Sequence, residues 1–225
     1  MSDETQGPVV EWSASEAIGY GWAKLKADPV GLILPIFVVA LINGLPNGAF
    51  NAVGNGLRAN DQQELASAVS LVSWLVGLVI SAFMTGGTLT LLFKAARGQP
   101  YALGDIFSGG KYFGRMFVTL LIYQLASGIG FALCIIPGVV IALGWSFATL
   151  LVVDKELSAV DALKESWRMT TGHKMSLFGF GLLCMLVGLL GFLVLCVGAL
   201  PAGVVIALAQ VHVYFRLSGQ EAAPA

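Results

Sequence analysis

Long apolar stretches without acidic residues dominate this chain of 225 residues. All thirteen acidic residues fall outside six segments, which lie near Val30–Phe50, Ala66–Phe93, Met116–Leu133, Pro137–Val153, Ser176 to about Val197, and Pro201–Leu217. This pattern suits a hydrocarbon solvent, in which an unpaired charge is costly. The sequence therefore predicts an all-α integral membrane protein with about six transmembrane helices.

The composition agrees with this fold class. Hydrophobic residues make up 57% of the chain and charged residues 11%, whereas about a quarter of a soluble domain is charged. The net charge of −1 gives no reason to expect a nucleic-acid partner. Cys134, Cys184 and Cys196 all lie in apolar sequence without a metal-type Cys/His spacing. We expect them to be small hydrophobic residues, and we expect no cofactor or metal.

The third, fourth and sixth segments are short for membrane spans, which need roughly 17–25 apolar residues. The stretch Met116–Val153 has room for two helices and a tight turn. A hairpin is the prediction there, and a re-entrant hairpin that does not cross fully stays open as the alternative.

Basic residues test the order of the spans, because cytoplasmic loops carry an excess of Lys and Arg. Only Arg58 falls on one side of the predicted membrane. The other side receives Lys24, Lys26, Lys94, Arg97, Lys111, Arg115, Lys155, Lys164, Arg168, Lys174 and Arg216. This asymmetry predicts a multi-pass protein of the bacterial cytoplasmic (inner) membrane with both termini in the cytoplasm.

An internal repeat follows the same order. Gly138-Val-Val-Ile-Ala-Leu143 recurs as Gly203-Val-Val-Ile-Ala-Leu208, and a proline precedes each copy. Ser13-Ala-Ser-Glu16-Ala-Ile18 resembles Ser158-Ala-Val-Asp161-Ala-Leu163, with a tryptophan six residues after each acid. Ala102-Leu-Gly-Asp105-Ile-Phe107 is a weaker third copy. We interpret residues 1–225 as one membrane domain of three parallel pseudo-repeats, about 11–93, 101–153 and 158–217, each a short helix followed by a hairpin.

The short helices have capping signals and an apolar face. Ser13 and Ser158 stand at N-cap positions, with an acidic residue three positions later, as in a capping box. Membrane lipids are the expected partners, and the expected interfacial contacts are Trp22, Lys24, Lys26, Trp167 and Arg168, since tryptophan favours the interface and basic groups meet anionic headgroups. In the alternative, each short helix is an ordinary loop helix that packs on its own hairpin.

No catalytic constellation can be drawn from the sequence. His173 and His212 are the only histidines, and Gly109-Gly110-Lys111 lacks the full spacing of a phosphate loop. The strongest intramembrane polar candidates are Gln124, Gln210 and His212. They form either a substrate site or interhelical hydrogen bonds that hold the helices together.

Small residues form two stripes at helical spacing, one at Ser73, Gly77, Ser81 and Thr85, the other at Gly181, Cys184, Gly188 and Gly191. Small side chains let helix backbones approach closely in lipid. The stripes therefore predict helix packing, either within one chain or between subunits.

Three motifs carry a family resemblance: Pro137-Gly138-Val-Val-Ile-Ala-Leu-Gly144, Leu157-Ser-Ala-Val-Asp161-Ala-Leu-Lys-Glu-Ser166 and Thr171-Gly-His-Lys174. Mainly over residues 100–217, the chain resembles a group of uncharacterised bacterial membrane proteins. That group is similar to the membrane domain of some glycerophosphodiester phosphodiesterases. The resemblance implies a fold and a compartment, and it carries over no catalytic residue.

The leading functional hypothesis is a non-enzymatic oligomeric scaffold or lipid-organising protein. It depends on the missing chemistry, the short spans, the small-residue stripes and the interfacial helices. Short spans favour clustering or local thinning of the bilayer. A transporter or channel for small solutes or lipids is the alternative, with a pathway near Gln124, Gln210 and His212. A membrane enzyme ranks third.

Overall fold

The computed structural model describes residues 13–193 and 198–224, and this part of the chain is helical throughout its regular structure. Six of its helical segments are long and apolar enough to cross a membrane. The predicted all-helical class with six candidate spans is thereby confirmed. Cys196 and the expected end of the fifth span at Val197 lie outside the described residues.

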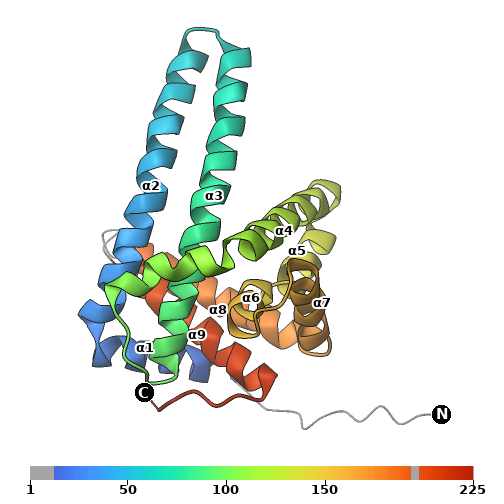
Figure 1. The fold of residues 1–225 in the computed structure, drawn as a ribbon. Coiled ribbons are helices and arrows are strands. Elements are labelled where there is room, and N and C mark those ends of the chain that lie inside the picture. The colour runs from blue at the N-terminus through green and yellow to red at the C-terminus, as the bar shows by residue number, and fades with distance from the viewer. Residues whose placement is uncertain (1–12, 194–197, 225) are drawn as a thin grey trace, which may run out of the picture.

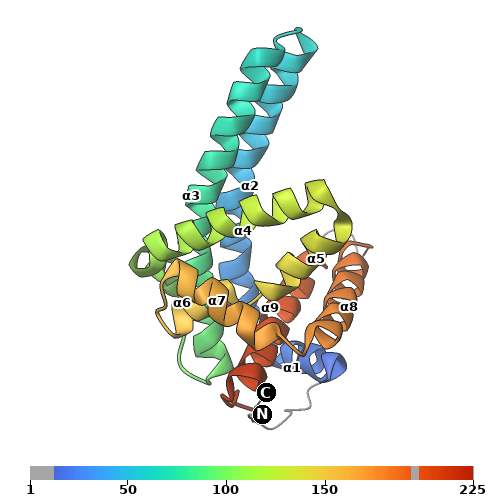
Figure 2. The same ribbon diagram turned by 90° about the vertical axis from the view of Figure 1, so that its right-hand side faces the viewer.

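The first two spans form a long antiparallel hairpin of α2 (Pro29–Ala59) and α3 (Gln63–Ala96). It rises well away from the other helices in both views (Figures 1 and 2). At 1.5 Å per residue, the 31 residues of α2 extend about 46 Å. The helices exceed the predicted spans because hydropathy marks only the apolar part, whereas the helix continues into the polar sequence beyond Phe50.

The middle unit begins with the 3-10 helix η1 (Leu103–Tyr112), which leads into α4 (Phe113–Leu133). A single extended residue, Cys134, turns the chain into α5 (Ile135–Gly144). α4 runs steeply across the direction of the α2–α3 hairpin in both views (Figures 1 and 2). The tight α4–α5 hairpin expected from the sequence is therefore present, but its first helix is not parallel to the first two spans.

The fourth predicted span is broken rather than continuous. α5 ends at Gly144, and α6 (Ala148–Asp154) starts after three residues. Short polar side chains elsewhere in the fold bind the backbone at this break: the Ser166 hydroxyl donates to the Gly144 carbonyl at 2.9 Å and accepts from the Phe147 N–H at 3.2 Å. Irregular backbone at membrane depth persists only where such partners are supplied.

The last unit contains α7 (Ala159–Thr170), α8 (Lys174–Leu193) and α9 (Ala199–Ser218). Ser158 caps α7 by accepting from the Asp161 N–H, as Ser13 caps α1 (Ala14–Ala27) by accepting from the Glu16 N–H. The Asp161 carboxylate bonds the Ser158 hydroxyl at 2.6 Å rather than the cap backbone. Gly172 follows α7 with a φ of +91°, the left-handed conformation that ends many helices.

The short helices pack on neighbouring units. η1 lies mainly against α3, α7 against α4, α5 and α6, and α1 along α9 with further contacts to α8. Each short helix thus covers a hairpin other than the one that follows it in the chain. The alternative in which each packs on its own hairpin does not describe these contacts.

Candidate functional site

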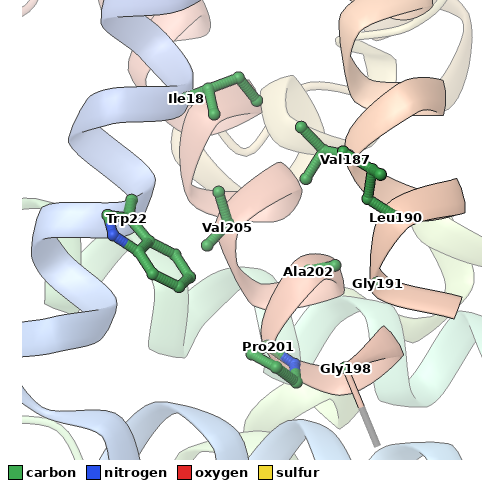
Figure 3. A pocket seen from close by; sticks show the side chains of 9 residues that line it. All are labelled: Ile18, Trp22, Val187, Leu190, Gly191, Gly198, Pro201, Ala202 and Val205. Carbon is green, nitrogen blue, oxygen red and sulfur yellow. The ribbon is translucent and has the colours of Figure 1, made fainter. Parts of the chain in front are cut away.

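An apolar cleft lies where α1 meets the last hairpin, and Figure 3 shows its lining. Its volume is about 500 Å³, within the usual range for ligand pockets. α1 contributes Ile18 and Trp22, α8 contributes Val187, Leu190 and Gly191, and α9 contributes Pro201, Ala202 and Val205, with Gly198 just before its first residue. Every one of these side chains is apolar apart from the indole N–H, so the cleft suits a hydrocarbon ligand.

Close backbone packing along one side forms this cleft. A Cβ atom on Gly21 would collide with the carbonyl oxygen of Val205, so α1 and α9 approach as closely as glycine permits. On the other side, a Cβ on Gly191 would lie only 2.6 Å from the Cβ of Ala202 and 2.7 Å from the Gly198 oxygen. These contacts leave an open space between α1 and α8, along the side of α9 that carries Ala202 and Val205 (Figure 3).

Two lysines of α1 have different surroundings. Lys26 Nζ lies 5.4 Å from the centre of the Trp22 ring that lines the cleft, within the range of a cation–π contact. Lys24 Nζ instead donates to the Pro224 carbonyl at 2.8 Å, and burial lowers the pKa of its ammonium group. Of these two lysines, Lys26 is therefore the better candidate to bind an anion beside the cleft.

The second predicted interfacial pair, Trp167 and Arg168, makes more contacts with other residues of the protein. Trp167 packs over Gly144 at the break between α5 and α6, and Lys174 Nζ lies 4.0 Å from the centre of the Trp167 ring. Arg168 donates to Glu165 at 2.9 Å, and this bond is the main cause that lowers the pKa of the Glu165 carboxyl. Trp167 is 36% exposed, compared with 50% for Trp22.

The three intramembrane candidates have separate partners. Gln124 accepts from the Trp74 indole N–H at 3.0 Å and joins α4 to α3. Gln210 donates to the Ser146 carbonyl at 3.0 Å, within the break between α5 and α6. Gln210 and His212 share α9, but positions two apart on a helix point in nearly opposite directions. The structure does not bring the three side chains to one site.

His212 faces α1. Its ring stacks on that of Tyr20 with a centroid distance of 4.5 Å, and Nε2 lies 3.9 Å from a Glu16 oxygen that also accepts from Arg216. Among the described residues, neither ring nitrogen has a hydrogen-bond partner. The Tyr20 hydroxyl donates to the carbonyls of Ala96 and Ala223, and burial raises the pKa of Tyr20 to about 12.

Several members of the small-residue stripes contact other helices of the chain. Ser81 donates to the Asn43 side chain at 3.2 Å, and a Cβ on Gly77 would lie 3.6 Å from Asn47. Gly188 and Gly191 face residues of α9, while Gly181 and Cys184 border a smaller pocket beside Gln210. Ser73 lines a polar groove of the α2–α3 hairpin.

That groove contains functional candidates that the sequence reasoning missed, among them Asn47 and Asn51. With Asn43 and Asn55 they recur every fourth residue on α2, and this spacing is a readable sign of a polar face. Within residues 13–193 and 198–224, no three His, Cys, Asp or Glu side chains gather as a metal site would require.

The helices and the apolar cleft define a multi-pass α-helical membrane protein. The uncharacterised protein family UPF0259 matches residues 50–195, and the chain belongs to this family. An uncharacterized protein of Mycobacterium tuberculosis is 26% identical over 92% of this chain and 69% of its own length. UPF0259 membrane proteins of Sodalis glossinidius and Yersinia pestis are 26% and 30% identical over 47% of this chain and 43% and 42% of their own lengths, respectively. No solved structure matches the chain.

Proposed function

We propose that this protein is a non-enzymatic, lipid-organising membrane scaffold that holds a phospholipid acyl chain in the cleft between α1, α8 and α9. The cleft itself carries the proposal, because it combines an apolar lining with a tryptophan and a lysine on one short helix. A lysine near an anionic membrane surface contributes about 1 kcal/mol to binding. The acyl chain would occupy the cleft while Lys26 meets the headgroup.

Filling the cleft tests this proposal. Val187 lines it, whereas Leu189, two residues along α8, does not. We expect Val187→Trp to displace the chain and lower lipid retention by about tenfold, because the indole takes the space of the ligand. Native mass spectrometry of the detergent-purified protein, with added phosphatidylglycerol, measures the retained lipid.

Leu189→Trp is the matched control, since it adds the same side chain to the lipid-facing side of α8. Equal retention by both variants and the unaltered chain would rule out the cleft as the acyl site. A melting temperature close to that of the parent chain shows that each variant is folded.

Self-association is part of the proposal and needs faces that the chain leaves free. Gly77, Gly188 and Gly191 have neighbours within the chain, so they support packing inside one subunit, whereas a Cβ on Gly181 would meet no atom within 4 Å. Large apolar side chains remain exposed along α2, α3 and α8. The same mass spectra report subunit number, and a strict monomer at every lipid content would remove the scaffold half of the proposal.

Placement in the inner membrane with cytoplasmic termini is also proposed, because the segment between the first and second spans carries the lone basic residue on its side of the membrane, Arg58. Labelling of Asn60→Cys and Ser218→Cys in intact cells, after replacement of the native cysteines by alanine, tests it. A membrane-impermeant maleimide should reach only the first. The similarity to phosphodiesterase membrane domains stays a prediction.

A small-solute or lipid transporter or channel is the second candidate, and the polar groove of α2–α3 favours it. The broken helix α5–α6 gives it less support, because side chains of α7 and α9 bind the free backbone groups there. Flux into proteoliposomes that disappears with Gln124→Leu or Gln210→Leu would promote this candidate.

A further inference from the structure

A polar seam joins the two helices of the long hairpin. The asparagine face of α2 meets small residues of α3 in antiparallel order, with Asn43 bonded to Ser81, Asn47 against Gly77, and Arg58 bonded to Ser70. The side-chain amides of Asn43, Asn47 and Asn51 each donate to the carbonyl four residues earlier. These bonds use one N–H of each amide, so the second N–H and the amide oxygen remain available for other partners in the seam.

The seam opens into a groove in its outer half, away from the rest of the fold. The groove has a volume of about 260 Å³ and is lined by amides, hydroxyls, one guanidinium group and aromatic rings. The polar members are Asn47, Asn51, Arg58, Ser70 and Ser73, with Trp74 at its side. A mixture of this kind suits a polar ligand with several acceptor oxygens.

Arg58 is held in place without a carboxylate. It donates to the Asn55 side chain and to the Ser70 hydroxyl, each at 3.3 Å. Within the described ranges no acidic residue pairs with it, including Asp61 and Glu64 near the turn. A guanidinium group has five N–H donors in a planar fork that fits phosphate oxygens, so donors remain free for an anion.

The depth of the groove identifies the phosphate that it can meet. The apolar run Val30–Phe50 contains 21 residues and spans about 31 Å as a helix, close to the thickness of the hydrocarbon core. Asn51 follows that run directly, and Arg58 lies seven residues further along α2, about 10 Å beyond it, so both lie at headgroup depth. Trp74 on α3 fits this level, since tryptophan is enriched at the membrane interface.

We infer that the outer groove of the α2–α3 hairpin binds the phosphodiester headgroup of a phospholipid in the leaflet opposite the cytoplasm, with Arg58 as the principal phosphate ligand. This site is separate from the apolar cleft of α1, α8 and α9. The inference deepens the proposed lipid-organising function by adding a lipid contact on the other side of the membrane. It requires the hairpin to cross the bilayer but does not require the cleft to be occupied.

The test uses the full chain in vesicles that contain phosphatidylglycerol with a photoreactive diazirine in its headgroup. Mass spectrometry of the cross-linked peptides locates the label. We expect it on the peptides around Asn51 and Trp74, and we expect Arg58→Gln to lower that labelling about tenfold, as the loss of a charge-assisted hydrogen bond would. Arg58→Lys keeps the charge without the fork and should lose only part of the labelling.

A filled groove provides a second, independent variant. Gly54 lines the groove and a Cβ there meets no atom within 4 Å, so Gly54→Leu starts from an unobstructed position, adds volume at the groove wall and keeps Arg58. Gly56 is equally open but lies outside the lining, which makes Gly56→Leu the matched control. We expect the first variant to lose labelling about tenfold and the second to retain it.

Three outcomes would overturn the inference. These are labelling that avoids the hairpin, labelling unchanged in Arg58→Gln and Gly54→Leu, and labelling abolished by millimolar inorganic phosphate, which would assign the groove to the free ion. A parallel lipid with the diazirine in its acyl chain reports on α8 and α9. Its response to Val187→Trp separates a failure of the cleft from a failure of the groove.

Discussion

At the scale of single residues, Asp28 joins three parts of the fold. It ends α1, caps α2 by accepting from the Gly31 N–H at 2.9 Å, and accepts from the Tyr101 hydroxyl at 2.7 Å. The Tyr101 bond is the largest cause that lowers the pKa of the Asp28 carboxyl, and the Gly31 bond is the second. Burial, followed by Asp28 itself, raises the pKa of Tyr101.

Tyr101→Phe should therefore destabilise the protein in a pH-dependent way. We expect a loss of about 1 kcal/mol near neutral pH, as for one hydrogen bond. Because the folded-state pKa of Asp28 is depressed, the stability linked to it is present above the ordinary aspartate pKa of about 3.9 and is lost as the pH falls through the folded value. Thermal unfolding in detergent, at pH values from about 3 to about 7, measures the difference in stability between variant and parent.

The difference should narrow at the acid end of that range. A gap between Tyr101→Phe and the parent that widens as the pH falls would contradict the assignment of the Asp28 bond. Half of this arrangement can be read from sequence alone, since the dipeptide Asp28-Pro29 is a local signal for the end of a helix. The Tyr101 partner is 73 residues away and belongs to no local pattern.

At the scale of elements, the break between α5 and α6 is the clearest departure from the sequence prediction. Hydropathy over Pro137–Val153 does not distinguish one apolar helix from two. The structure decides because Ser166 and Thr170 of α7 both donate to the Gly144 carbonyl, and Gln210 of α9 donates to Ser146. Distant side chains replace the helical bonds that the break gives up.

Ser166→Ala should consequently lower the stability of the fold strongly, although it removes only one oxygen atom. It removes one donor from the Gly144 carbonyl and the acceptor of the buried Phe147 N–H, so we expect a destabilisation of about 1–3 kcal/mol. Ser67 is exposed and bonds only within its own helix, and Ser67→Ala should change stability by no more than about 0.5 kcal/mol. Thermal unfolding of both variants checks the contrast, and equal melting temperatures would show that the break does not depend on Ser166.

At the scale of the whole molecule, the short helices tie successive units together. η1 covers the first hairpin, α7 covers the middle one and α1 covers the last, so the first described helix lies against the last one. Polar bonds strengthen this closure at the base of the fold. Asp154 accepts from Arg97, Tyr214 and Gln220, and Glu16 pairs with Arg216.

Two glycines of α1 test the closure. A Cβ on Gly21 would collide with the Val205 backbone, whereas one on Gly19 meets no atom within 4 Å. We expect Gly21→Leu to cost about 1–3 kcal/mol through overpacking and to expose α1 to limited proteolysis. Gly19→Leu should behave like the parent chain. Equal protease sensitivity of the two variants would show that the protection of α1 does not depend on its close packing against α9.

The sequence by itself determined the helical class, the six candidate spans and the capped ends of α1 and α7, because hydropathy and capping depend on neighbouring residues. It also picked out the small residues that pack α3 on α2 and α8 on α9, but not their partners. The tertiary structure decided which hairpin each short helix covers, where the fourth span breaks, and why Gln124, Gln210 and His212 face different elements. From an apolar helix face one can infer that the face is covered, and from a polar side chain in an apolar segment that it needs a hydrogen-bond partner. The identity of the cover or the partner depends on contacts between segments far apart in the chain.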